Sequence, residues 1–280
     1  MIPIIPEGDT TIFHFSFFIL PRTLLRSINQ EDKSDDMKQR VFTITENAPL
    51  TERVSLLRLR GDCSEIQRPG QFVDLALPGF FLRRPFSVCD WTGDELRLVY
   101  EQAGRGTASL RDLPAGEKLD VLTGLGNGFD LSRAGDAPLL VGGGSGVSPL
   151  LGLARRLRKQ GLRPHVILGF GRAEDIFLTE DFYCLGLTPT VTTEDGSFGI
   201  RGLVTAAMDV PHSFLYACGP LGMLRAVSEK SPAPGQLSLD ARMGCGFGAC
   251  MGCSIRTVNG PKRVCKDGPV FDKEELLWDD

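Results

Sequence analysis

The chain has 280 residues and a mass of 30.5 kDa, about twice the usual size of one domain, so a single small module is excluded. Hydrophobic residues make up 42% of it and charged residues 24%, which excludes a chain that is disordered from end to end. Because 31 basic residues stand against 35 acidic ones, with a net charge of -4, we expect neither nucleic acid nor a membrane as a partner.

Residues 1–37 differ in composition from the rest of the chain. Their apolar stretch at 12–20 is interrupted by His14 and Ser16 and has about half the length that crosses a bilayer. No basic segment precedes it, and Pro21-Arg22 follows where small residues would mark a signal-peptide cleavage site. We therefore expect a cytoplasmic protein in which residues 1–37 are a leader outside the functional fold, either a loose extension or a stretch that is not translated.

Residues 38–135 are expected to form the first domain, an antiparallel β-barrel. Short runs of alternating apolar and polar residues are separated there by proline, glycine and aspartate. They lie at 41–50, 53–61, 70–79, 86–91 and 95–101. Such spacing is typical of an antiparallel sheet or a small barrel. A short helical stretch at 107–112 is expected after a turn that contains Gly104 and Gly106.

Residues 136–235 are expected to form a parallel, doubly wound α/β domain, because apolar runs alternate there with helical stretches. The helix expected after the run at 138–144 repeats its apolar residues at helical spacing, at Leu150, Leu151, Ala154 and Leu157. Further strands are expected at 164–171, 188–196 and 213–218, and a further helix at 221–230. A linker at 231–236 is expected to close this domain, leaving residues 236–280 as a small C-terminal domain.

Eight cysteines fall into two groups. Four stand singly along the chain, and four lie within 21 residues near the C-terminus, at Cys245, Cys250, Cys253 and Cys265. A chain of this size does not need a disulfide framework, and no export signal accompanies it. The clustered thiols therefore indicate metal ligands, whereas the scattered Cys63, Cys89 and Cys184 are expected to be small buried hydrophobes.

The spacing Cys-x4-Cys-x2-Cys-x11-Cys favours a [2Fe–2S] cluster. Zinc ribbons usually present two Cys-x2-Cys pairs, whereas this spacing is of the plant type. Glycines at 244, 246, 248 and 252 let the backbone wrap tightly with its amides aimed at the sulfurs. A Rieske centre is excluded because the histidines lie elsewhere, at 14, 165 and 212. Zinc and disulfides remain the alternatives.

Two glycine-containing turns are candidate nucleotide sites. Val141–Pro149 joins an expected strand to an expected helix, where glycines permit the close approach of a pyrophosphate and the helix N-terminus offers unpaired N–H groups. Pro149 stands where the third glycine of the standard motif would be. The segment Cys218-Gly219-Pro220 ends another expected strand, at the edge where ligands of parallel sheets bind. The alternatives are a turn that merely joins two elements and, for Cys218, a buried small hydrophobe.

The segment Arg83-Arg84-Pro85-Phe86-Ser87 of the first domain offers chemistry suited to a flavin nucleotide. An arginine can hold a pyrophosphate through bidentate hydrogen bonds, and a serine can bind the edge of a flavin ring. Paired arginines on a solvated strand face are the alternative. The turn Gly104-x-Gly106-Thr107 is a second candidate phosphate site.

In this order, the motifs resemble the ferredoxin-reductase superfamily, in which a flavin-binding barrel precedes a nicotinamide-nucleotide domain. The C-terminal segments ARMGCGFGACMGCSIRT and RVCKDGPVFD resemble the electron-transfer subunits of NAD-dependent dihydroorotate dehydrogenases more closely, as do LRRPFSV, GRGT and TGLGNGFDL. The resemblance covers residues 38–275.

The resemblance implies three redox groups and their contacts. It implies FAD contacts at Arg84, Pro85, Phe86, Ser87, Val99, Tyr100, Glu101, Gly106 and Thr107. It implies an exchangeable NAD, rather than NADP, lined by Gly144, Gly146, Pro149, Gly219 and Pro220, with Cys218 as a catalytic residue. The cluster ligands are the four clustered cysteines. Since relatives often carry a basic residue in place of Glu101, we expect its backbone to make the flavin contact.

The resemblance also implies a partner. Dihydroorotate is oxidised on FMN in a separate catalytic subunit, and electrons then pass through the [2Fe–2S] cluster and FAD to NAD+ in pyrimidine biosynthesis, within a heterotetramer of two copies of each chain. This chain has no room for a substrate barrel of about 250 residues beside its assigned domains. The alternatives are a related reductase subunit of a sulfite reductase or hydrogenase, and a redox-sensing regulator. Cys245 disfavours the transhydrogenase-type subunits, which often have Asp there.

Overall fold

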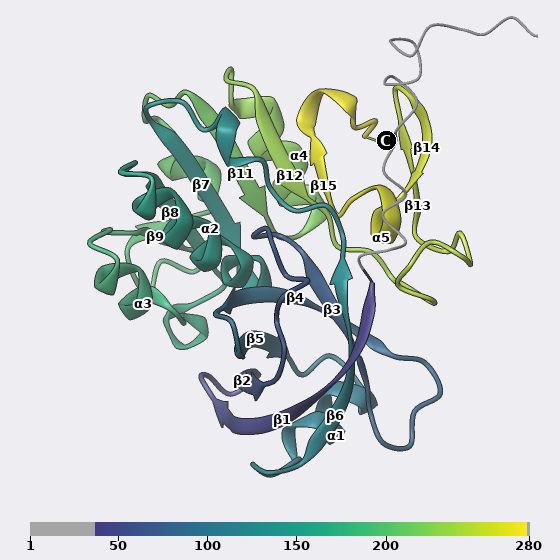
Figure 1. Cartoon of the computed structure of the whole chain (residues 1–280). Coiled ribbons are helices and arrows are strands. Elements are labelled where there is room, and N and C mark those ends of the chain that lie inside the picture. The colour runs from purple at the N-terminus through teal and green to yellow at the C-terminus, as the bar shows by residue number, and fades with distance from the viewer. Residues whose placement is uncertain (1–36, 279–280) are drawn as a thin grey trace, which may run out of the picture. The chain divides into compact units, whose positions relative to one another are not determined.

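The computed structural model describes residues 37–278 of the chain. The expectation that residues 1–37 are a leader lies outside these residues except for Met37. Figure 1 shows a β-barrel, a larger sheet flanked by helices, and a hairpin near the C-terminus. No helix within residues 37–278 is long and apolar enough to cross a membrane.

The barrel has six strands that close on themselves in the order β1-β2-β5-β4-β3-β6, and neighbouring strands are antiparallel throughout. The strands are β1 (Lys38–Pro49), β2 (Val54–Arg60), β3 (Phe72–Ala76), β4 (Arg84–Trp91), β5 (Glu95–Glu101) and β6 (Lys118–Leu125). Helix α1 (Arg105–Arg111) connects β5 to β6. The predicted barrel is confirmed, with β6 as a strand that the sequence analysis did not name.

Side-chain alternation explains why these segments form a barrel. On β6 the residues alternate between buried and more exposed positions, with Leu119 and Val121 inside the barrel. On β1, Phe42 and Ile44 point into the same core. A period of two places one set of side chains inside the barrel and the other outside.

The second sheet has seven strands in the order β10-β9-β8-β7-β11-β12-β15. They are β7 (Pro138–Gly143), β8 (His165–Phe170), β9 (Thr190–Thr193), β10 (Ile200–Arg201), β11 (Phe214–Cys218), β12 (Gly235–Ser238) and β15 (Val270–Asp272). All pairs are parallel except β12 with β15. Every residue of β7 is buried, as expected for a parallel strand that is covered on both faces.

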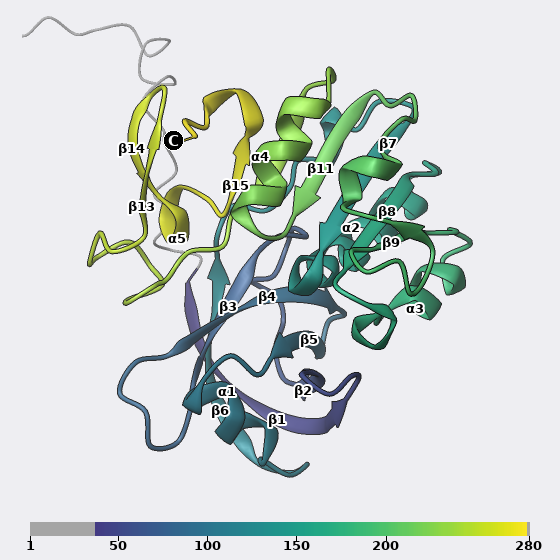
Figure 2. The same cartoon turned by 180° about the vertical axis from the view of Figure 1, so that it is seen from behind.

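Helices cover both faces of this sheet. Helices α2 (Val147–Lys159) and α3 (Thr179–Cys184) pack on one face, which Figure 1 shows in front. Helix α4 (Leu221–Lys230) packs on the other face, which Figure 2 shows. The predicted doubly wound architecture is therefore confirmed, including the burial of the four repeating residues of α2, Leu150, Leu151, Ala154 and Leu157.

The sheet continues beyond the boundary expected at residue 235. β12 pairs in parallel with β11, and β15 pairs with β12, with Leu237 opposite Phe271. Both side chains are buried in the core under α4. The predicted linker at 231–236 is therefore wrong for Gly235 and Gln236, because these residues gain strand partners that are distant in sequence. Residues 239–269 form an excursion between β12 and β15.

The excursion contains the hairpin β13 (Ser254–Thr257) and β14 (Gly260–Arg263), followed by the short helix α5 (Val264–Asp267). Among residues 37–278, the short 3-10 helices are η3 (Leu131–Arg133), η4 (Gly144–Gly146), η5 (Ala173–Asp175), η6 (Val204–Ala207) and η7 (Lys273–Glu275).

Helix α2 also packs against β4 and so joins the barrel to the sheet. Arg155 and Arg156 pair with the mostly buried carboxylate of Asp90 at 2.6 and 3.1 Å. The Arg156 guanidinium also lies over the Trp91 ring, 3.3 Å from its centroid. A Cβ on Gly152 of α2 would lie 2.6 Å from the Cys89 carbonyl oxygen. The helix and the strand can approach this closely because the residue is glycine.

Candidate redox site

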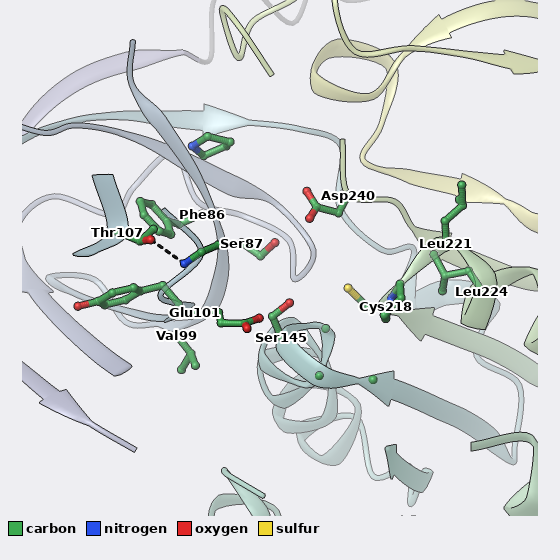
Figure 3. Close-up of a pocket in the computed structure, with 18 residues that line it drawn as sticks. Phe86, Ser87, Val99, Glu101, Thr107, Ser145, Cys218, Leu221, Leu224 and Asp240 are labelled. Atoms are coloured by element: carbon green, nitrogen blue, oxygen red, sulfur yellow. Dashed lines mark hydrogen bonds between the residues drawn. The ribbon is translucent and has the colours of Figure 1, made fainter. Parts of the chain in front are cut away.

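A cavity of about 600 Å³ lies where the barrel meets the sheet. Most of the residues predicted for flavin and nucleotide binding line it together: Pro85, Phe86, Ser87, Val99, Tyr100, Glu101, Thr107, Gly144, Gly146, Cys218, Gly219 and Pro220. Figure 3 shows Phe86 and Glu101 on one side and Cys218 on the other. One cavity therefore unites motifs that are more than 100 residues apart in sequence.

The barrel wall of this main cavity comes from the paired strands β4 and β5. The rings of Phe86 and Tyr100 meet edge to face, with centroids 5.9 Å apart. The Tyr100 hydroxyl donates to the side-chain oxygen of Asn47 at 2.9 Å, and burial raises the pKa of Tyr100. The Glu101 carboxylate pairs with Arg53 at 2.8 Å. Because the Glu101 side chain is engaged in this ion pair, the backbone of Glu101 remains the predicted flavin contact.

The turn before α1 completes the barrel wall. The Thr107 hydroxyl oxygen accepts hydrogen bonds from the backbone N–H groups of Ala103 and Gly104, at 2.9 and 3.2 Å. Gly106 and Arg84 do not line the main cavity. A Cβ on Gly106 would lie 2.9 Å from Nε of Arg84, so this glycine makes room for the arginine. The two residues thus lie side by side at the turn.

The sheet wall comes from the carboxyl ends of β7 and β11, which are parallel neighbours. A Cβ on Gly146 would lie only 2.3 Å from the Cys218 carbonyl oxygen. Gly144 has a φ of +53°. The two turns therefore need glycine in order to lie together. Pro149 is buried in the first turn of α2 and lines neither cavity described here, so the structure does not place it in the predicted nucleotide contact.

Cys218 lines the main cavity as a largely buried side chain. Burial raises the pKa of its thiol to about 12. The thiol is therefore neutral at pH 7, and Cys218 can contact a ligand ring but does not serve as a thiolate nucleophile.

Four residues that line the main cavity lie outside the predicted motifs: Ala103, Leu221, Leu224 and Asp240. Gly143 and Ser145 also line it; they belong to the predicted turn Val141–Pro149, although neither was named as a contact. Asp240 brings a carboxyl group whose pKa is raised by burial. It follows β12 at the carboxyl edge of the sheet, where ligands bind. Asp240 ends the run Leu237-Ser-Leu-Asp240, and an acidic residue after such a run could have indicated a ligand-binding position. It was not predicted because a linker, not a strand, was expected over 231–236.

A second cavity of about 330 Å³ continues along the carboxyl ends of β7, β8 and β9. It shares Gly143, Gly144 and Pro220 with the main cavity. Its other lining residues are Gly169, Phe170, Gly171, Thr192, Glu194, Gly202, Leu203, Val204, Thr205, Gly222, Met223 and Ala226. The sequence analysis named none of these as site residues.

The four clustered cysteines lie in two pairs. The sulfurs of Cys253 and Cys265 are 3.3 Å apart. Cys245 and Cys250 form the other pair, because the Cys245 sulfur accepts from the N–H of Cys250 at 3.4 Å and from that of Ala249 at 3.2 Å. Within residues 37–278, no group of three or more His, Cys, Asp or Glu side chains lies close enough together to hold a metal ion. Two pairs of thiols fit a two-iron cluster held by four cysteines.

Electrostatics support the same assignment. Burial raises the pKa of the Cys245 thiol, but hydrogen bonds from backbone N–H groups, first that of Cys250 and then that of Phe247, outweigh it and lower the pKa to about 6. Burial and the neighbouring Cys253 raise the pKa of Cys265 to about 12. The amides that stabilise a thiolate at Cys245 suit an iron ligand, whereas Cys265 has to lose its proton when a metal binds.

Glycines shape the cluster loop as the sequence predicted. Gly246 and Gly248 have φ values of +77° and +94°. A Cβ on Gly246 would lie 2.4 Å from an oxygen of Asp74, which belongs to β3 of the barrel. The loop can therefore lie directly against the barrel.

The remaining cysteines give one correction. Cys63 and Cys89 are buried, as expected, and burial raises the pKa of each thiol to about 12. Cys184 is exposed at the end of α3, so the expectation that it is a buried hydrophobe is wrong. Cys184 ends a helix of only six residues, which was not predicted. The sequence pattern therefore did not indicate whether this residue lies on a buried or an exposed face.

Comparisons with known proteins agree with this geometry. Residues 240–277 match the family model of the iron–sulfur cluster binding domain of dihydroorotate dehydrogenase B. The chain is 42% identical over 251 residues to the "Dihydroorotate dehydrogenase B (NAD(+)), electron transfer subunit" of Bacillus caldolyticus, covering 84% of this chain and 97% of that protein. It is 38% identical over 255 residues to the subunit of the same name from Streptococcus mutans, covering 85% and 98%.

Solved structures show the same fold. The NADH-dependent reduced ferredoxin–NADP oxidoreductase superposes with a TM-score of 0.77 at 29% identity, covering 85% of this chain and 90% of that one. The ferredoxin reductase of carbazole 1,9a-dioxygenase, at 20% identity and a TM-score of 0.59, covers 69% of this chain and 64% of that one and shows the fold alone.

The iron–sulfur domain, the flavin- and nucleotide-binding fold and the paired cysteines support the predicted [2Fe–2S] cluster, FAD and NAD. The extent of identity decides against a sulfite reductase or hydrogenase subunit and against a regulator. The chain belongs to the family of electron-transfer subunits of the NAD-dependent dihydroorotate dehydrogenases of type B.

Proposed function

We propose that this chain accepts electrons from a separate, FMN-containing dihydroorotate dehydrogenase subunit and delivers them to NAD+, in a cytoplasmic complex of two copies of each chain. The observation that carries this proposal is the main cavity, in which residues of the barrel and of the sheet face one another. Hydride exchange with a nicotinamide requires such a shared site, because the two ring systems have to meet.

The barrel wall is suited to FAD. Phe86 and Tyr100 offer apolar surface for a ring system, and Ser87 offers a hydroxyl. Arg84, held beside Gly106, supplies positive charge for a pyrophosphate at the α1 turn. When bound, FAD supplies exchange between two-electron hydride chemistry and one-electron transfer.

The sheet wall is suited to NAD. The N-terminus of the 13-residue helix α2 points its free N–H groups at the turn containing Gly144 and Gly146. Cys218, as a neutral thiol, is placed to contact the nicotinamide without changing its own charge. Pro220 continues the wall into the second cavity, which leaves room for the rest of a dinucleotide.

The cluster loop is close to the main cavity along the chain. Asp240 lines the cavity, and Cys245 follows five residues later, a segment that spans at most about 18 Å. At the outer side of the loop Cys250 is exposed, as are the apolar side chains of Phe247 and Met251. We infer that the catalytic subunit docks on this surface, where exposed apolar groups surround a cluster ligand.

The proposal predicts a division of labour between the subunits. The isolated chain, loaded with FAD and cluster, should reduce small dyes with NADH but should not oxidise dihydroorotate. Adding the FMN-containing subunit should couple dihydroorotate oxidation to NAD+ reduction. Absorbance at the nicotinamide and dye wavelengths measures both reactions. Oxidation of dihydroorotate by the isolated chain, or failure to oxidise NADH, would contradict the proposal.

A further inference from the structure

The barrel wall of the main cavity has two parts that belong to different elements. Tyr100 lies on β5 and Thr107 lies in the first turn of α1, and both line the cavity. Asn47, on β1, lines neither cavity. Its side-chain amide nevertheless hydrogen-bonds to Tyr100 and to the end of α1, so it connects the two parts of the wall.

The hydrogen bonds of Asn47 fix the orientation of its amide. The side-chain nitrogen donates to the backbone carbonyls of Leu110 and Leu113 at 2.8 and 3.0 Å, and to that of Arg111 at 3.4 Å. The side-chain oxygen accepts from the Tyr100 hydroxyl at 2.9 Å. A carbonyl oxygen can only accept, so a reversed amide would place its own oxygen against three others. These four hydrogen bonds form the Asn47 bridge.

Helix α1 depends on the Asn47 bridge for its position. It has seven residues, and a helix this short gains too little from its own hydrogen bonds to be stable in water. The last carbonyls of a helix need partners from outside its regular ladder, and Asn47 donates to those of Leu110 and Arg111. The Leu110 side chain is fully buried in the barrel core. The end of α1 is therefore fastened to β1, which fixes where Thr107 lies one turn earlier.

The same amide sets the direction of the Tyr100 ring. Tyr100 is only 3% exposed, and its ring meets the Phe86 ring edge to face. Burial raises the pKa of Tyr100, although hydrogen bonds with Ser55 and Asn47 oppose the shift. The hydroxyl therefore keeps its proton at pH 7 and donates it to Asn47. Because a buried hydroxyl that loses its acceptor is costly, the ring stays in the orientation that keeps this bond.

We propose that Asn47 is a positioning residue for the flavin, which holds the Tyr100 ring and the α1 turn in one arrangement before FAD binds. A site whose parts are already in place loses less free energy to ordering when its ligand binds. Asn47 acts through Tyr100 and α1 and not by touching the flavin, since it lines neither cavity. The inference rests on the proposed function only for the place of FAD on the barrel wall.

Two substitutions each break one side of the Asn47 bridge. Asn47→Asp keeps an oxygen for Tyr100 but removes the donor to the α1 carbonyls, whereas Tyr100→Phe keeps the α1 bonds but removes the hydroxyl. Each should raise the FAD dissociation constant of the full-length, cluster-loaded chain by about tenfold, which corresponds to about 1.4 kcal/mol. Because either change breaks the same bridge, the double variant should bind FAD no more weakly than the weaker single variant.

Flavin fluorescence on serial dilution of the loaded protein measures each dissociation constant. The visible absorbance spectrum of the bound flavin should also shift in each variant, because the aromatic surface beside it changes orientation.

Tyr216→Phe is the matched control. The Tyr216 hydroxyl donates to the Asp130 carbonyl at 2.7 Å, and its side chain is fully buried and lines neither cavity. This substitution removes the same kind of buried hydroxyl as Tyr100→Phe. It should lower the Tm and leave the FAD dissociation constant and the flavin spectrum unchanged.

The inference would be overturned if Asn47→Asp and Tyr100→Phe behaved like the control and lowered the Tm without changing FAD binding. Additive effects in the double variant would also overturn it, because they would indicate two independent contacts. Should Asn47→Asp fail to fold, an unchanged FAD affinity of Tyr100→Phe overturns the inference by itself. If wild-type protein oxidised no NADH while the variants lost FAD affinity as expected, the proposed function would fail and the role of Asn47 would stand.

Discussion

Asp74 lies on β3 with its carboxyl group inside the protein, against the cluster loop. The residue is 2% exposed, and one of its carboxyl oxygens has no hydrogen-bond partner. Burial raises the pKa of Asp74 to about 6, while Arg83 and Arg84 pull it down. Because Gly246 leaves no Cβ in the way, this carboxyl sits directly under the loop.

Asp74 should make folding less favourable as the pH rises. Its carboxyl pKa is raised above the ordinary value of 3.8, so the folded state binds its proton more tightly, and stability is lost as the pH rises from about 4 to about 6. Asp74→Asn should therefore raise the apparent Tm of the loaded protein at pH 7.5, by the equivalent of about 2 kcal/mol, and by about half as much at pH 5, which lies between the two pKa values.

Asp120→Asn is the control for this prediction, because Asp120 pairs with Arg83 at 2.8 Å and should only lose stability when that pair is removed. Thermal unfolding followed by flavin fluorescence at the two pH values measures both variants. A destabilising Asp74→Asn at pH 7.5 would contradict the account of this carboxyl.

Residues that carry chemistry within a local motif were predictable from sequence, and residues brought in by tertiary contacts were not. Ser87, Thr107 and Cys218 stand in recognisable motifs and line the main cavity. Asp240 and Glu194 line the cavities only because β12 and β9 deliver them to one edge of the sheet. The spacing of residues in the sequence does not indicate which strand ends are neighbours in the sheet.

At the scale of elements, helix α2 performs two tasks. Its N-terminus lies at the glycine turn of the main cavity, and its side packs against β4 of the barrel. Gly152 is the point of closest approach, since its Cα faces the Cys89 carbonyl. The orientation of the barrel relative to the nucleotide turn therefore depends on this contact.

Gly152→Ala should destabilise the protein, although alanine is the better helix former. The added methyl group would lie 2.6 Å from the Cys89 carbonyl oxygen, and such overpacking costs about 1 to 3 kcal/mol. Gly222→Ala in α4 is the matched control, because nothing lies within 4 Å of its added Cβ, and a gain of up to about 1 kcal/mol is expected. Chemical denaturation of the loaded protein measures both. Equal effects of the two substitutions would contradict the packing argument.

The elements that the sequence analysis missed depend on distant partners. β12 has four residues and follows Ser231-Pro-Ala-Pro234, a segment typical of a linker, yet its pairing with β11 makes Gly235–Ser238 a strand. β15 has three residues and forms against β12. β6 is different, because the alternation of its buried residues is a local pattern of the sequence. Longer, strongly periodic segments such as α2 needed no tertiary information.

At the scale of the molecule, the fold joins three redox-related regions through a few shared segments. The barrel and the sheet share the main cavity, and the excursion between β12 and β15 starts beside that cavity and carries the cluster loop. Partly buried ion pairs, such as Arg97 with Asp181 of α3, join the barrel to the sheet domain. This arrangement is what a carrier between a partner protein and a soluble nucleotide requires.

The most direct test of electron transfer through the cluster is Cys250→Ser, assayed in the isolated chain and in the complex with the catalytic partner subunit. We expect NADH–dye activity to persist with FAD bound, whereas dihydroorotate-dependent NAD+ reduction should fall to the rate seen without this chain. Cys184→Ser, at an exposed cysteine outside the cluster, should change neither activity. If Cys250→Ser retained FAD and lost both activities together, or kept the coupled reaction, the proposed order of cluster, FAD and NAD would be contradicted.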